Sequence, residues 1–212
     1  MIGKKVLILS PHTDDAELGC GGFIAKMLEE GKEILWVVFS TAEESLPPHM
    51  PPDTLVTEFK MVAKNLNLNE NQYIINRFSV RKLSEKRQEI LELLVRIRKT
   101  FAPDLVIGPS LNDFHQDHKT VSEEMIRAFK SWTSIICYEL PWNHVSFDTQ
   151  FFVKLEARHM AKKLELLNLY KSQLEIQRFY FSEDFIKGLA CTRGAQVNHK
   201  YAEAFEVIRW IN

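Results

Sequence analysis

The stretch VLILSPHTDDAELGCGG, residues 6–22, decides the fold of this chain. Its apolar run, residues 6–10, predicts a buried strand. Apolar residues beyond the glycines recur at helical spacing, so a strand gives way to a helix here. His12, Asp14 and Asp15 stand at that junction, the usual place for a site in an open α/β sheet. His and Asp are ordinary zinc ligands, and a cation would relieve the repulsion between the two neighbouring acids.

Strand and helix patterns alternate along the first two thirds of the chain. The strand patterns are apolar runs, mostly continuous as in parallel strands buried on both faces, at residues 34–39, 72–75, 105–107 and 134–140. Helical stripes cover residues 53–66, 83–101 and 151–170. Thr120 and Glu123 have capping-box spacing and predict a helix from there to about residue 130. We therefore expect a Rossmann-like α/β fold, a mostly parallel sheet with helices on both faces, forming one domain over residues 1–212.

The composition of the chain limits the classes of protein to which it can belong. The chain has 212 residues, 45% of them hydrophobic, and a formal net charge of −1 with scattered Lys and Arg, which argues against nucleic-acid binding. No apolar run approaches the roughly 20 residues of a membrane span. Three distant cysteines form no disulfide framework, and a core strand close to Met1 leaves no room for a signal peptide. We expect a cytoplasmic protein.

A second polar cluster, His115-Gln116-Asp117-His118, also follows a predicted strand. It repeats the three-residue spacing of His12 and Asp15. Because the carboxyl ends of parallel strands lie at one edge of a sheet, the two clusters are expected to meet there. Each cluster alone is a modest signal, but the pair predicts a metal site.

Together these motifs resemble the LmbE-like (PIG-L) metal-dependent N-deacetylases. The resemblance rests on His12-Thr13-Asp14-Asp15 with Gly21-Gly22 and on the second cluster, and it extends to Lys171-Ser172-Gln173 and Tyr201-Ala202-Glu203-Ala204-Phe205. It covers nearly the whole chain. The family usually has Pro at the position of Thr13, which changes loop stiffness but no ligand.

The resemblance implies a role for each residue of the two clusters. His12, Asp15 and His118 would hold one zinc ion, and Asp14 would be the general base for the metal-activated water. His115 would stabilise the oxyanion or protonate the leaving amine, with Asp117 orienting that imidazole and keeping it cationic. The chemistry is consistent, since three protein ligands leave zinc an open position for water.

The implied substrate is an N-acetylated amino sugar, such as N-acetylglucosamine, or a conjugate of one. Glu43, His144 and Arg193 are candidate substrate contacts, whereas His159, amid charges on a helix, is expected at the surface. Leu55 stands where sugar-specific relatives tend to carry an Arg, so the exact sugar stays open. Family members often form homo-oligomers, but no periodic interface pattern shows in this sequence.

Two other functions remain open from the residues. Two histidines and a carboxylate also suit Fe²⁺ and other divalent metals, and they form the facial triad of non-haem iron oxygenases. Those enzymes usually have all-β barrels, unlike the alternation seen here. A non-catalytic Rossmann-like binding module would need no metal.

Overall fold

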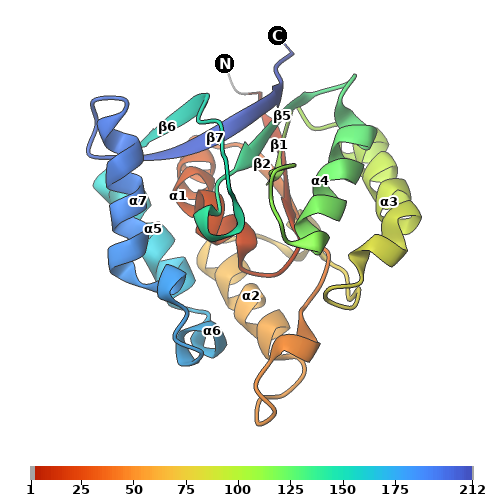
Figure 1. The fold of residues 1–212 in the computed structure, drawn as a ribbon. Coiled ribbons are helices and arrows are strands. Elements are labelled where there is room, and N and C mark those ends of the chain that lie inside the picture. The colour runs from red at the N-terminus through yellow and green to blue at the C-terminus, as the bar shows by residue number, and fades with distance from the viewer. Residues whose placement is uncertain (1–2, 212) are drawn as a thin grey trace.

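The computed structural model describes residues 3–211, and in it a seven-stranded sheet lies between two layers of helices (Figure 1). The strand order is β3-β2-β1-β4-β5-β7-β6. The first five strands are parallel, and β7 is antiparallel to both of its neighbours. The strands are β1 (Lys5–Ser10), β2 (Glu33–Val38), β3 (Tyr73–Ile75), β4 (Leu105–Pro109), β5 (Ser134–Tyr138), β6 (Phe151–Leu155) and β7 (Tyr201–Arg209). The predicted Rossmann-like, mostly parallel α/β fold is confirmed.

Alternate side chains of the central strands enter two separate cores. In β1, Val6 and Ile8 pack on one face of the sheet, while Leu7 and Leu9 pack on the other, and all four are fully buried. Successive side chains of a strand point to opposite faces, so a strand covered on both sides needs an unbroken apolar run. The continuous apolar runs in the sequence are therefore explained by the burial of these strands on both faces.

The helices divide between the two faces (Figure 1). Helices α3 and α4 cover one face, and α1, α2, α5 and α7 cover the other. Their bounds are α1 (Asp15–Glu29), α2 (Thr54–Asn65), α3 (Arg87–Thr100), α4 (Gln116–Phe129), α5 (Ala157–Leu167), α6 (Lys171–Glu175) and α7 (Glu183–Ala195). Within residues 3–211, no helix combines the length and the apolar character that crossing a membrane requires.

The strand order reverses beside β1. From β1 the chain moves to β2 and β3 on one side, then returns to β4 and β5 on the other. The loops that follow β1 and β4 therefore diverge and leave a crevice at the carboxyl edge of the sheet. Both predicted clusters lie here, on the ends of these two loops and in the first turns of α1 and α4.

Three local predictions are wrong. Residues 151–155 are strand β6, and only residues 157–167 of the expected helix are helical, because residues 151–155 pair with β7. Helix α4 begins at Gln116 rather than near Thr120, since the His115 side chain caps it by accepting the Asp117 backbone N–H. His159 is buried, with its Nε2 atom 2.7 Å from Glu29 Oε2.

Candidate functional site

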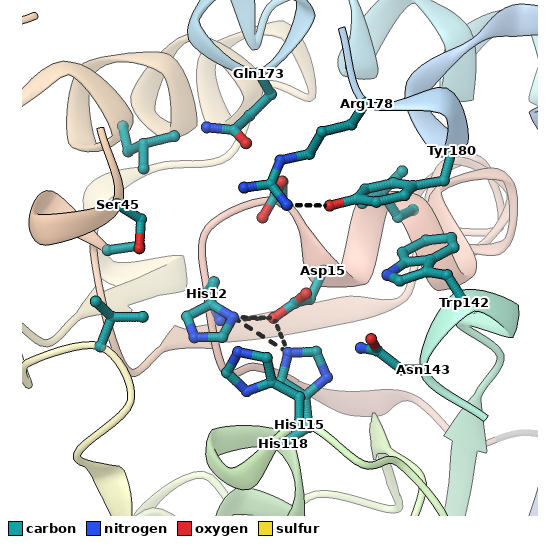
Figure 2. Close-up of a pocket in the computed structure, with 15 residues that line it drawn as sticks. His12, Asp15, Ser45, His115, His118, Trp142, Asn143, Gln173, Arg178 and Tyr180 are labelled. Carbon is teal, nitrogen blue, oxygen red and sulfur yellow. Dashed lines mark hydrogen bonds and ion pairs between the residues drawn. The ribbon is translucent and has the colours of Figure 1, made fainter. Parts of the chain in front are cut away.

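The loops after β1 and β4 bring one carboxylate and two imidazoles to a common point (Figure 2). His12 Nδ1 and His118 Nε2 lie 3.1 and 3.2 Å from Asp15 Oδ2, and 3.2 Å from each other. The Asp15 carboxylate also accepts the backbone N–H of His12 at 2.7 Å, which sets the turn between them. The three atoms form a nearly equilateral triangle.

The second nitrogen of each imidazole is anchored by a further carboxylate. Asp117 Oδ2 lies 3.0 Å from His12 Nε2, and Asp113 Oδ2 lies 2.7 Å from His118 Nδ1. Such outer carboxylates fix the ring orientation of metal-binding histidines and raise their basicity. Each ring therefore presents its other nitrogen to the triangle.

Asp117 has a different partner from the one expected. Its carboxylate accepts the backbone N–H groups of Arg81 and Leu83 and contacts His12, not His115. The hydrogen bonds of this carboxylate therefore do not support the prediction that it orients His115. Asp113 was not among the predicted site residues, although an acid two residues before a histidine motif was a usable signal.

The charges around the triangle favour a cation. Burial lowers the pKa of His12, but the charge of Asp15 and hydrogen bonds with Asp117 and Asp15 raise it overall to about 9. Burial also lowers the pKa of His118, and the charge of Asp15 with the Asp113 hydrogen bond raises it overall to about 10. Burial raises the pKa of Asp15, yet the charges of His118 and His12 hold it well below its usual value. In this field protons stay on the two imidazoles unless another cation replaces them.

His115 differs from the other two histidines. Burial, followed by the positive charges of His118 and His12, lowers its pKa to about 4. Its Nδ1 accepts the backbone N–H of Asp117 at 3.2 Å, so the neutral ring carries its proton on Nε2. The lowered pKa does not support the expected cationic His115. Nitrogen atoms of His12, His115 and His118 all lie within 4.8 Å of one another, and the three histidines can bind a metal ion.

Asp14 borders the same space. It stands at the N-cap position of α1 but makes no capping hydrogen bond. Burial, and then the charge of Asp15, raises its pKa to about 6, against opposing effects that include the charges of His12 and Arg178. A carboxylate with this pKa is ionised at neutral pH and basic enough to accept a proton.

A cavity of about 230 Å³ opens beside these groups. Five predicted site residues line it, whereas Asp117 is fully buried and is not part of the lining. The lining consists of His12, Asp14, Asp15, Leu18, Ala42, Ser45, Leu55, Val80, His115, His118, Trp142, Asn143, Gln173, Arg178 and Tyr180. Figure 2 shows Gln173, Arg178 and Tyr180 on the wall opposite the histidines.

The side chains of the three candidate substrate contacts interact with other residues of the protein. Glu43 pairs with Arg77 at 2.9 Å, His144 Nε2 accepts the Leu140 N–H at 3.1 Å, and Arg193 forms an ion pair with Glu139. None of the three is among the described residues that line the cavity. This geometry does not support them as substrate contacts. The sequence pattern also carried no signal for Arg178 and Tyr180, which reach the cavity from the irregular tail.

Comparisons with known proteins agree with this architecture. A model of the PIG-L family, described as GlcNAc-PI de-N-acetylase, matches residues 7–129, more than half of the chain. The uncharacterized deacetylase YaiS of Escherichia coli K12 is 26% identical over 80% of this chain and 91% of its own length.

Two solved structures share the fold at low identity. The N,N'-diacetylchitobiose deacetylase of Pyrococcus horikoshii, in complex with an inhibitor, has a TM-score of 0.78 at 22% identity, covering 97% of this chain and 84% of its own. The 4-carboxy-2-hydroxymuconate hydratase GalB of Pseudomonas putida KT2440 has a TM-score of 0.76 at 18% identity, covering 99% and 98%. The fold therefore hosts more than one reaction, and the chemistry has to be argued from the site.

Proposed function

The chain belongs to the PIG-L family of N-deacetylases, and from this premise we propose that it is a zinc-dependent hydrolase of N-acetylated amino sugars or their conjugates. The reaction adds water across the amide C–N bond and yields acetate and a free amine. The observation that carries the proposal is the triangle of His12 Nδ1, Asp15 Oδ2 and His118 Nε2, with Asp14 in the lining of the same cavity.

The donor atoms fit a zinc ion. Zinc bound tetrahedrally at 2.0–2.1 Å keeps its ligand atoms about 3.3 Å apart. The sides of the triangle are 3.1, 3.2 and 3.2 Å. We therefore favour His12, Asp15 and His118 as the ligands over a set of three histidines. When bound, zinc supplies Lewis acidity and lowers the pKa of a coordinated water to roughly 7.

Asp14 and His115 provide the remaining chemistry. The Asp14 carboxylate accepts the proton of the attacking water and returns it to the nitrogen of the leaving amine. The Nε2–H group of neutral His115 donates a hydrogen bond to the amide oxygen as negative charge develops there. Asp113 and Asp117 keep the two ligand imidazoles in place. A pKa of about 4 argues against His115 as the proton donor to the amine.

The substrate class is inferred from the family and from the diacetylchitobiose deacetylase fold. The test is a panel of N-acetylated sugars, free, nucleotide-linked and lipid-linked, incubated with protein that has been stripped of metal and reloaded with zinc. We expect release of acetate and amine in equal amounts, only with metal present. A chain that takes up no divalent cation, or that releases acetate from no sugar, would refute the proposal.

Variants separate the two possible ligand sets. His118→Ala and Asp15→Ala should lose both zinc and activity. His115→Ala should retain one zinc per chain and lose turnover, because His115 acts on the substrate. Loss of zinc from His115→Ala would favour the three-histidine set instead. Substrate-coupled oxygen consumption by iron-loaded protein would point to the oxygenase alternative.

We further propose that residues 1–212 act as one domain in a reducing cytoplasm. One continuous sheet contains strands from both halves of the chain, and all three cysteines are free. Both observations support the proposal.

A further inference from the structure

Arg178 lies at the mouth of the cavity, on the wall opposite the histidines (Figure 2). Its NH1 group donates a hydrogen bond to the Tyr180 hydroxyl at 2.7 Å, and its guanidinium carbon lies 5.8 Å from the Tyr180 ring centroid. The Tyr180 ring stacks on Trp142, with centroids 4.0 Å apart and planes 8° from parallel. The aromatic pair therefore holds the guanidinium group from one side.

Within residues 3–211, no carboxylate forms an ion pair with Arg178. The arginines that do have a carboxylate partner are Arg77, Arg87, Arg127, Arg158 and Arg193. A guanidinium group has five N–H donors in a planar fork, and the Tyr180 hydroxyl accepts from only one of its nitrogens. The Arg178 side chain is exposed and lines the cavity, so its remaining donors can reach a ligand bound there.

A bound substrate changes the surroundings of this cation. A sugar that fills the cavity removes water from the guanidinium group, which is costly unless the sugar supplies a matching acceptor. Carboxylate and phosphate groups match the planar fork with two parallel hydrogen bonds, whereas a hydroxyl accepts only one. Neutral partners for hydroxyls are already present in the lining at Ser45, Asn143 and Gln173.

We propose that Arg178, held by Tyr180, binds an acidic substituent of the substrate, so that the preferred substrate is an N-acetyl amino sugar carrying a phosphate or a carboxylate. This inference rests on the proposed deacetylase function and narrows its substrate class. The acetamide lies at the zinc ligands, and the acidic group lies across the cavity at Arg178. Arg178 is a specificity residue that itself transfers no proton. Its charge acts on Asp14 equally for every substrate, so the ratio between acidic and neutral sugars isolates its role in binding.

The kinetic test compares neutral N-acetylglucosamine with three acidic sugars. These are N-acetylglucosamine 1-phosphate, N-acetylglucosamine 6-phosphate and N-acetylmuramic acid, which carries a carboxylate. For the wild type we expect kcat/KM to be about 10- to 100-fold higher for at least one acidic sugar, as for a charged hydrogen-bonded pair. Whether a phosphate or the carboxylate is preferred identifies the acidic group.

Substitutions assign this preference to Arg178. Arg178→Gln should bring the acidic-to-neutral ratio of kcat/KM close to one, mainly through KM, because the contact exists before and during reaction. Arg178→Lys should keep part of the ratio, since the charge remains without the fork. Arg96→Gln makes the same charge change on the exposed side of α3 and should leave the ratio unaltered. Equal kcat/KM for all sugars in the wild type, or an unchanged ratio in Arg178→Gln, would overturn the inference.

A binding measurement separates this inference from the deacetylase proposal. Calorimetry on metal-free protein compares glucosamine 6-phosphate, glucosamine and inorganic phosphate, so that neither turnover nor zinc contributes. The expected result is at least about 10-fold tighter binding of the phosphorylated sugar than of glucosamine, lost in Arg178→Gln. If the phosphorylated sugar binds in this way but no sugar is deacetylated, the proposed function is wrong and the anion site is supported. If sugars are deacetylated with no dependence on Arg178, the proposed function is supported and the anion site is wrong.

Discussion

Asp14 and Asp15 are adjacent in the chain, yet their carboxyl groups titrate in opposite directions. Burial raises the pKa of Asp14 to about 6, while the charges of His118 and His12 hold the pKa of Asp15 well below its usual value despite burial. Neighbouring acids with separated pKa values commonly divide the roles of a reaction between them. Here the permanently ionised Asp15 suits a metal ligand, and the more basic Asp14 suits a proton acceptor.

The pH dependence of the reaction follows from Asp14. Only the ionised carboxylate accepts a proton, so kcat/KM is expected to rise with pH through about 6. Asp14→Asn should lower kcat by at least about 100-fold, remove this limb and keep one zinc per chain. Asp184→Asn, in the first turn of α7, serves as the control. An Asp14→Asn variant with wild-type kcat and an unchanged pH profile would exclude Asp14 as the base.

At the scale of elements, helix α1 is broken inside its own span. Cys20 has φ −147° and ψ 26°, which are not helical values. The N–H groups of Gly22 and Phe23 beyond the break donate to the Glu203 carboxylate of β7 at 3.0 and 2.7 Å. Lys163 of α5 binds the same carboxylate at 2.7 Å, and both side chains are buried. Glu203 thus acts as an internal cap that joins α1, α5 and β7.

Helix α1 also packs closely against β6 and β7 at Gly22. A Cβ atom at Gly22 would lie 2.4 Å from Leu155 and 3.2 Å from Glu203, so the close approach of α1 to β6 and β7 requires glycine there.

Removal of the cap should destabilise the fold strongly. Glu203→Ala leaves Lys163 buried without its partner, and we expect a loss of about 3–5 kcal/mol in the free energy of unfolding, measured by urea denaturation. The Glu203→Ala/Lys163→Ala double variant should lose less than the sum of the single ones, because the contact is shared. As a control, Glu89→Ala removes an exposed ion pair and should change stability little. A loss below about 1 kcal/mol in Glu203→Ala would contradict the capping role.

At the scale of the whole molecule, the proposed ion would join two halves of the sheet. His12 and Asp15 follow β1, whereas His118 lies in α4 after β4, on the far side of the strand-order reversal. A ligand that binds only the folded chain stabilises it by mass action. Metal binding is therefore coupled to the stability of the whole fold.

Zinc should raise the melting temperature of the metal-free protein. At about 100 times its dissociation constant, zinc adds about 2.7 kcal/mol, or roughly 5–10 °C for a chain of this size. Because the pKa values of His12 and His118 are raised to about 9 and 10, their protons stabilise the metal-free fold fully below about pH 6.5, and this contribution disappears as pH rises through 9–10. Protons therefore compete with zinc most at low pH.

The zinc-induced shift should accordingly be larger at pH 8 than at pH 6. Scanning calorimetry with and without zinc at the two pH values measures it. His118→Ala should abolish the shift, and His49→Ala, whose side chain is exposed, should retain it. An equal shift in wild type and His118→Ala would show that zinc binds elsewhere.

The sequence by itself determined the five parallel strands of the sheet and the two polar clusters at the carboxyl ends of two of them. These features depend on local hydrophobic periodicity, which each segment carries independently of its neighbours in space. The tertiary structure alone decided that residues 151–155 form a strand, because that choice depends on pairing with β7 about fifty residues later.

Tertiary structure also decided the partners of the charged side chains. Asp117 faces His12, Asp113 faces His118, and Arg178 reaches the cavity from the tail. Each of these placements depends on how a helix or loop packs against an element distant in the chain. Local pattern therefore identifies which residues carry the chemistry, and packing between distant elements decides which atoms they contact.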